Sequence, residues 1–144
     1  VIRIMNKKTL KEIYKRYDLT KDDIFLLPFG DKSKYVICRT GIEKIQAKLN
    51  IQINYKLEKC SDDHKSVIVL ATGVVFESMT AVNGQPPKPK HVVSSFGECN
   101  PSNNKNSFSV CMAEKRAKSR VVLQISGLYK LNIYSEDESE DFRR

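Results

Sequence analysis

The sequence of 144 residues has no tryptophan, only two histidines and only six glycines. Two histidines, His64 and His91, are few for acid–base catalysis near neutral pH or for a histidine-rich metal site. No apolar stretch approaches the ~20 residues that a membrane helix needs, and residues 1–5 are too short for the apolar segment of a signal peptide. We therefore expect a cytoplasmic protein that makes no contact with a membrane.

The motifs of common enzyme classes are also missing. There is no nucleophile elbow, no glycine-rich phosphate loop and no pair of metal-ligating histidines. The four cysteines, Cys38, Cys60, Cys99 and Cys111, form no Cys-x-x-Cys pair. These spacings argue against structural zinc and favour free thiols. We expect a protein that is not an enzyme and that binds no metal or other cofactor.

Positive charge is the most informative feature of the composition. Twenty-five Lys and Arg residues against 17 Asp and Glu residues give a net charge of +8. Residues 135–144 hold five acids and two arginines, which leaves 23 basic and 12 acidic residues, a net +11, in residues 1–134. A basic body favours a polyanionic partner such as nucleic acid. We expect one domain over residues 1–134 and an acidic, disordered tail over 135–144, available to a protein partner.

Hydrophobic periodicity predicts an α+β fold. It indicates a short helix over residues 10–17, a second helix that starts with the capping box Thr40-Gly41-Ile42-Glu43, and a long helix over roughly 108–126. Apolar alternation or apolar runs predict strands at the positions 51–58, 67–76 and 91–96. No crossover helix separates these strands. We therefore expect an antiparallel meander of three or slightly more strands, with helices packed on one face, in the order helix, three strands, long helix.

The strongest candidate for a binding site is the basic segment of the long helix, which contains Lys115, Arg116, Lys118 and Arg120. At about 100° per residue, Arg116 and Arg120 share one flank of the apolar stripe, and Lys118 lies on the opposite flank. Guanidinium groups fit phosphate well, so the pattern predicts that this segment binds nucleic acid. The alternative is a solvated helix face, with Glu114 and Lys118 as an ordinary i,i+4 ion pair.

A second candidate is the proline-rich loop before the third strand. Its Lys88 and Lys90 are predicted to clamp a nucleic-acid backbone, although such loops are more often solvated hairpin connections. Tyr55 and Phe96 are candidates for base stacking. Because Tyr55 shares a strand face with Ile51, core packing is its favoured role.

Three segments carry a resemblance to known proteins. They are Ser94-Ser95-Phe96-Gly97-Glu98, Met112-Ala113-Glu114-Lys115-Arg116-Ala117-Lys118-Ser119-Arg120 with the residues up to Tyr129, and Tyr134-Ser135-Glu136-Asp137-Glu138. These segments resemble small proteins encoded by phages and mobile elements of Bacteroides-type bacteria. The order of elements over roughly residues 40–129 is similar to that of single-strand annealing proteins of recombination, the Erf-like and Rad-type group.

The resemblance implies binding of single-stranded DNA, strand annealing, homo-oligomeric rings or filaments, and no nucleotide cofactor. The chain is shorter than many annealing proteins, and Lys115, Arg116 and Arg120 are the positions that match the basic helix of that group in pattern. Two alternatives remain open. One is a domain that binds double-stranded RNA or DNA, because the order helix, three strands, helix also describes a double-stranded RNA-binding domain. The other is a protein-interaction module of a mobile element, without a nucleic-acid role.

Overall fold

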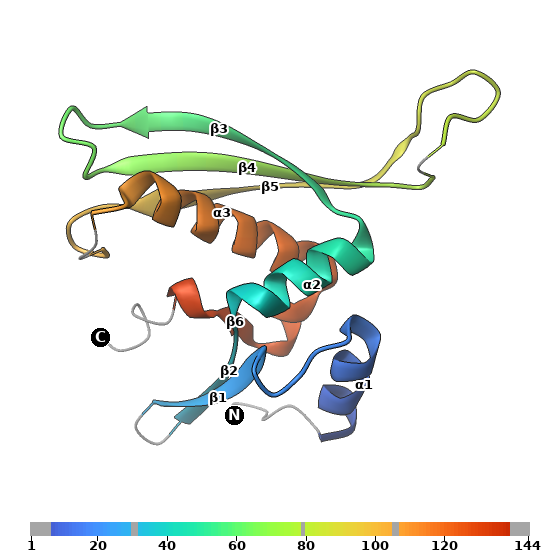
Figure 1. Cartoon of the computed structure of the whole chain (residues 1–144), viewed down its shortest axis with the longest axis horizontal. Helices are drawn as coiled ribbons and strands as arrows, with labels where there is room; N and C mark the ends of the chain where they lie inside the picture. The colour runs from blue at the N-terminus through green and yellow to red at the C-terminus, as the bar shows by residue number, and fades with distance from the viewer. Residues whose placement is uncertain (1–6, 30–31, 79, 105–106, 139–144) are drawn as a thin grey trace.

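The structure is a computed structural model that describes residues 7–29, 32–78, 80–104 and 107–138. Figure 1 shows a three-stranded sheet, then α3 with α2 beside it, then a small sheet with α1. The elements are α1 (Lys7–Tyr17), β1 (Ile24–Phe29), β2 (Lys32–Ile37), α2 (Arg39–Leu49), β3 (Gln52–Cys60), β4 (Val67–Phe76), β5 (Pro89–Cys99), α3 (Ser109–Ser126), a 3₁₀ turn η1 (Leu128–Leu131) and β6 (Ile133–Ser135). The predicted α+β class is confirmed.

The predicted meander is also confirmed, because β3, β4 and β5 form an antiparallel sheet with β4 in the centre. One face of β4 is buried at alternate positions, and α3 packs on this face. The helix approaches the sheet closely because small residues meet there. A Cβ atom added to Gly97 of β5 would collide with the Ala113 carbonyl oxygen and with the backbone and side chain of Ala117.

The opposite side of α3 is buried as well. Val122 and Leu123 are fully buried in a second core with residues of α1, β2, α2 and β6. The sequence pattern indicates one apolar stripe on this helix, and this stripe faces the sheet. Because both sides are covered, much less of α3 reaches solvent than the sequence indicated.

The small sheet contains two strands that the sequence analysis did not predict. β1 pairs with β2 antiparallel, and β6 pairs with β2 parallel, so that Tyr35 lies opposite Ile133. Pro28 weakens the strand signal of β1 but is tolerated on a sheet edge. β6 has only three residues, too few to show a periodicity.

The predicted capping box of α2 does not form. The helix begins at Arg39, its N-cap residue is Cys38, and Cys38 makes no side-chain cap hydrogen bond. Thr40 instead donates from Oγ1 to Oδ1 of the buried Asp23 at 2.6 Å. The other end of the helix is as predicted, because Asn50 adopts the left-handed C-cap conformation with φ 52°.

The predicted domain boundary after residue 134 is wrong for residues 135–138. Ser135 belongs to β6 and is buried, and Glu138 is 9% exposed. These positions belong to the fold because their carboxylates accept hydrogen bonds from Ser119 and Arg120 of α3, which composition alone does not reveal. Residues 139–144 of the predicted tail lie outside the described residues.

Candidate nucleic-acid interface

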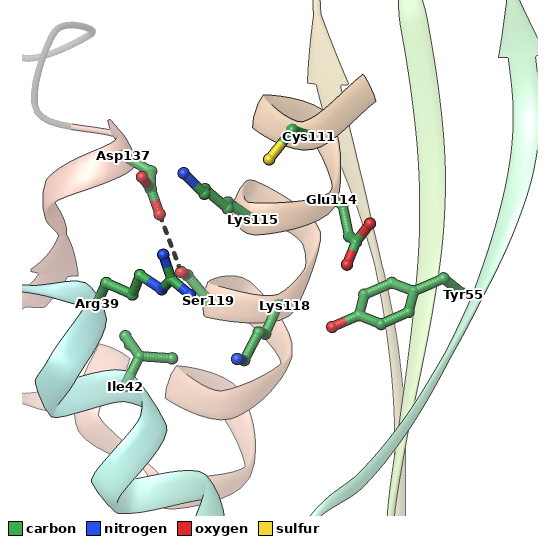
Figure 2. Close-up of a pocket in the computed structure, with 9 residues that line it drawn as sticks. All are labelled: Arg39, Ile42, Tyr55, Cys111, Glu114, Lys115, Lys118, Ser119 and Asp137. Atoms are coloured by element: carbon green, nitrogen blue, oxygen red, sulfur yellow. Dashed lines mark hydrogen bonds between the residues drawn. The ribbon is translucent and has the colours of Figure 1, made fainter. Parts of the chain in front are cut away.

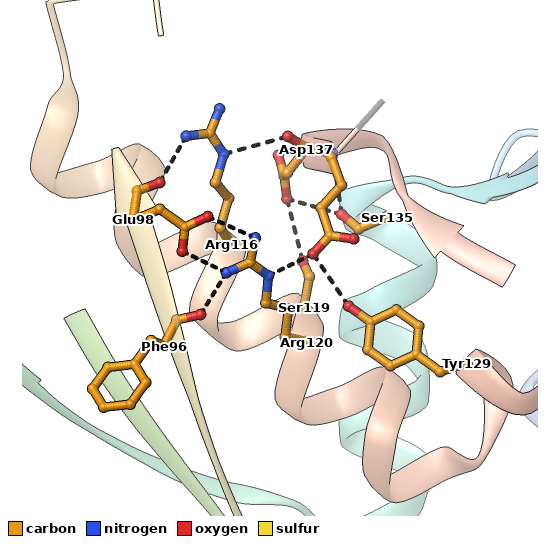
Figure 3. A network of polar contacts seen from close by, with 9 residues as sticks. Phe96, Glu98, Arg116, Ser119, Arg120, Tyr129, Ser135 and Asp137 are labelled. Atoms are coloured by element: carbon orange, nitrogen blue, oxygen red, sulfur yellow. Dashed lines mark hydrogen bonds and ion pairs between the residues drawn. The ribbon is translucent and has the colours of Figure 1, made fainter. Parts of the chain in front are cut away.

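Arg116, one of the predicted phosphate ligands, is 4% exposed and lies beneath the edge of the sheet (Figure 3). Its Nη1 donates to the carbonyl oxygen of Glu98 and its Nη2 to that of Asn103, both at 2.8 Å. Its Nε is 3.4 Å from the carbonyl oxygen of Asp137. All three nitrogens of the guanidinium group are therefore engaged by the backbone of this chain.

Arg120, the second predicted phosphate ligand, lies between two carboxylates (Figure 3). It donates to Glu98 at 2.7 and 3.0 Å and to Glu138 at 2.6 Å, and its Nη1 also reaches the carbonyl oxygen of Phe96 at 2.7 Å. The hydrogen bonds from Arg120 lower the pKa of Glu98. Burial, together with the Glu138 carboxylate, raises the pKa of Tyr129, which donates to that carboxylate at 3.2 Å.

These contacts correct the predicted role of the Arg116 and Arg120 pair. Helical spacing predicts both on one flank of α3, and they do lie together, but that flank faces the edge of β5. The acids that neutralise Arg120 come from distant positions in the sequence, so the helix pattern did not reveal them. Both arginines hold the fold together, and the interface proposed below does not include them.

The other flank of α3 lines an open groove, which we call the Tyr55 groove (Figure 2). It has a cavity volume of about 240 Å³. Lys115 and Lys118 come from α3, Arg39 from the start of α2 and Tyr55 from β3. The complete lining is Arg39, Ile42, Tyr55, Cys111, Glu114, Lys115, Lys118, Ser119 and Asp137.

The groove exists because α3 covers β4 and β5 but not β3. A helix is about 10–12 Å wide with its side chains, whereas strands lie about 4.8 Å apart, so one helix covers roughly two strands. Tyr55 is therefore 41% exposed and Leu57 is 55% exposed, although Ile51 at the start of the same alternating pattern is buried. The favoured core role of Tyr55 is wrong for this reason.

Positive groups outnumber negative ones along the groove. Arg39 donates to Glu43 at 3.0 Å on the solvent side, and the Lys118 ammonium group is 4.0 Å from the same carboxylate. No salt bridge engages Lys115 within the described part of the chain. Asp137 accepts hydrogen bonds from two serine hydroxyl groups, one of which is that of Ser119 at 3.2 Å.

The phenol group of Tyr55, which lines the groove, is a neutral hydrogen-bond donor. Burial and the nearby Glu114 carboxylate raise the pKa of Tyr55 to about 12. The phenol therefore keeps its proton at neutral pH. Figure 2 shows its ring extending from β3 toward α3, beside Lys118 and Glu114.

The predicted lysines of the proline-rich loop lie elsewhere. Lys88 and Lys90 are exposed at the end of the sheet where Phe76 pairs with Pro89. Tyr55 lies opposite Ala71, further along the same strands. The structure therefore brings Lys115 and Lys118 together with Tyr55, but it does not bring Lys88 and Lys90 to them.

No protein-family model, no curated protein and no solved structure matches the chain. Among the described residues, no helix has both the length and the apolar composition to cross a membrane. The same residues contain no cluster of three or more His, Cys, Asp or Glu side chains suited to a metal ion.

Proposed function

We propose that the Tyr55 groove binds single-stranded nucleic acid, with single-stranded DNA as the first candidate. The observation that carries the proposal is a half-exposed aromatic ring in a groove lined by Lys115, Lys118 and Arg39. Aromatic rings that stack on bases, next to cations that bind phosphates, are the usual means of binding single strands without reading their sequence.

The exposed ring of Tyr55 favours a single strand over a duplex, because the bases of a duplex are stacked on one another and leave no face free for the ring. The groove is small, since its volume of about 240 Å³ is below the roughly 300–1,000 Å³ of most ligand pockets. Tyr55 would stack on a base of the strand, while the lysines and Arg39 would bind the neighbouring phosphates. We expect base identity to matter little, because stacking on an aromatic ring and contacts with phosphates do not read base edges.

The order of elements extends this proposal to strand annealing in phage or mobile-element recombination. The helix, antiparallel meander and long helix of residues 39–126 are similar in order to the annealing proteins. In this proposal α3 contributes lysines to the groove, whereas its arginines support the fold. Homo-oligomer formation and a cytoplasmic location belong to the same proposal.

The test compares two double variants of equal charge. Lys115→Ala with Lys118→Ala removes two groove cations, whereas Lys11→Ala with Lys15→Ala removes two exposed cations from α1. Fluorescence anisotropy with labelled single-stranded DNA should show a loss of about 1–3 kcal/mol for the first variant only. The slope of log affinity against log salt should also decrease, by about 0.7 per lost phosphate contact.

Other outcomes would favour another function. Equal losses in both double variants would mean that binding follows overall charge and not the groove. Tighter binding of duplex DNA or duplex RNA than of single strands at both salt concentrations would favour the duplex-binding alternative. No binding to any of the three nucleic acids at low salt would leave the protein-interaction alternative.

A further inference from the structure

The outer edge of β3 presents a row of unpaired backbone groups. Within the described residues, β4 is the strand that pairs with β3, and no other backbone hydrogen bond reaches positions 54–59. The residue before the strand is covered, because the carbonyl oxygen of Ile51 accepts a hydrogen bond from the Gln46 side chain at 3.2 Å. An open strand edge of this kind is a template for another strand.

The side chains along this edge are exposed on both faces of the strand. All six positions from Asn54 to Lys59 are exposed, whereas a strand with one covered face would alternate between buried and exposed positions. Leu57 lies opposite the buried Val69 and is still 55% exposed, because α3 does not reach β3. A strand paired with this edge would therefore bury Leu57 and satisfy the free backbone groups.

The charged side chains of this edge are self-complementary. Nζ of Lys56 lies 3.3 Å from Oε1 of Glu58, so both project from the same face of β3, on either side of Leu57. Antiparallel pairing of two copies about an axis at Leu57 places Lys56 of each copy opposite Glu58 of the other. An axis at Lys56 or at Glu58 would oppose like charges, which destabilises a sheet. Lys59, next to Glu58 at the β-bulge, adds a positive charge at each end of this pairing.

We propose that β3 binds β3 of a second copy of this chain, antiparallel and about a two-fold axis at Leu57. The two three-stranded sheets then form one continuous sheet. The backbone groups of each edge satisfy those of the other, the two Leu57 side chains cover one another, and the Lys56 and Glu58 side chains form two pairs of opposite charge across the axis. Such a dimer is closed, because it uses the same surface of both copies.

This pairing leaves the Tyr55 groove of each copy open. The two-fold axis is perpendicular to the joined sheet, so both α3 helices lie on the same face of it. Because α3 covers β4 and β5, about four strand spacings, or roughly 19 Å, separate the two helix axes. A helix is about 10–12 Å wide with its side chains, which leaves about 8 Å between the two helices. The dimer therefore does not depend on the proposed function and does not exclude it.

Sedimentation velocity without nucleic acid tests the dimer and its charge pairs. With rising concentration, the unmodified chain should change from the mass of one copy to the mass of two. Lys56→Glu and Glu58→Lys should each weaken the dimer roughly tenfold, because each opposes like charges twice. An equimolar mixture of these two variants should dimerise again, since every acid then faces a lysine. Lys11→Glu and Glu12→Lys, which make the same changes on the exposed face of α1, are the matched controls and should not affect dimerisation.

Disulfide trapping tests the position of the axis. Leu57→Cys places two thiols opposite one another at the axis, within the distance that a disulfide spans, so mild oxidation should link the two copies. Asn54→Cys is the matched control from an exposed position of the same strand, because its two copies would lie six residues, or about 20 Å, apart. Both variants also carry Cys111→Ser, which removes the exposed thiol of α3.

Three results would overturn the proposal: a chain that stays monomeric at its highest soluble concentration, a mixture of Lys56→Glu and Glu58→Lys that associates no better than either variant alone, or a disulfide that forms as readily with Asn54→Cys as with Leu57→Cys. Failure of the proposed function is a separate outcome. Lys115→Ala with Lys118→Ala should leave the dimer intact, and a chain that binds no nucleic acid should still dimerise.

Discussion

The Arg116 guanidinium group donates a hydrogen bond of 2.8 Å to the main-chain carbonyl oxygen of Glu98 and so joins α3 to the edge strand β5. The carbonyl oxygens of an edge strand usually accept from water or from another strand. Here they accept from two arginines, because Arg120 reaches the carbonyl oxygen of Phe96 at 2.7 Å. This side of the sheet is closed by side chains of the helix that packs beneath it.

Arg116→Ala should destabilise the protein by about 2–4 kcal/mol, since it removes a buried group and leaves its carbonyl acceptors without a donor. Arg116→Lys should also destabilise it, because an ammonium group cannot replace the planar fork of donors. Urea unfolding measures both changes. Lys118→Ala, which removes the same charge from a more exposed position of α3, should change stability by no more than about 0.5 kcal/mol.

Glu138→Ala should destabilise the protein by about 2–4 kcal/mol. The carboxylate is largely buried between Arg120 at 2.6 Å and the Tyr129 hydroxyl at 3.2 Å, so its loss leaves an incompletely paired arginine. Thermal unfolding of the variant should show a lower melting temperature. An unchanged melting temperature would restore the prediction of a tail that starts at residue 135 and contributes nothing to the fold.

Asp23 should make stability depend on acid pH. Burial raises the pKa of Asp23, but hydrogen bonds from Lys44 at 2.7 Å, Thr40 at 2.6 Å and the Thr20 N–H at 2.8 Å outweigh this and bring the pKa to about 2. An unfolded Asp has a pKa of about 3.9. The contribution, about 2 kcal/mol, is present above pH 4 and lost as the pH falls toward 2.

The variant Asp23→Asn tests this pH dependence directly. Urea unfolding should find it less stable than the unmodified protein at pH 7, and the difference should shrink between pH 4 and pH 2. A difference that stays constant over this interval would contradict the lowered pKa. Asp62→Asn, in an exposed turn, is the matched control and should leave stability unchanged at both ends of the interval.

Tyr55→Ala should weaken binding of single-stranded DNA by about 1–3 kcal/mol, the usual contribution of one stacked base. Phe96→Ala is the matched control. Phe96 is 53% exposed on the opposite face of the same sheet, because it lies opposite Leu70 while Tyr55 lies opposite Ala71. Anisotropy titrations of both variants distinguish the two faces, and an effect confined to Phe96→Ala would move the interface to the outer face.

Local sequence signals predicted the elements that have clear periodicity. The alternating strand, the apolar central strand and the long helix that ends at Gly127 all formed within a few residues of their expected positions. β6 was missed because its pairing with β2 is a contact between distant parts of the chain, and its three residues carry no pattern of their own. The capping box at Thr40 was mispredicted for a similar reason. Thr40 donates its hydrogen bond to Asp23, which is distant in the sequence, and does not cap α2.

The sequence predicted some residues of the candidate site and missed others. Lys115 and Lys118 followed from helical spacing, which places them away from the Arg116 flank. Arg39 was missed because nothing in its local sequence reveals that the start of α2 lies beside α3. The exposure of Tyr55 depends on how many strands one helix covers, which is a property of the assembled layers.

The closed edge at β5 also limits how this sheet can associate with other copies of itself. A strand that approaches β5 at residues 96 and 98 must first displace two arginines from their carbonyl acceptors. β3 has no such cover, since β4 is its one hydrogen-bonded neighbour within the described residues. Fibril growth needs an adhesive edge on both sides of each copy. The two arginines therefore disfavour strand addition at the end of β5 nearest Cys99, whereas the β3 edge and the β5 edge toward Pro89 carry no contact of this kind among the described residues.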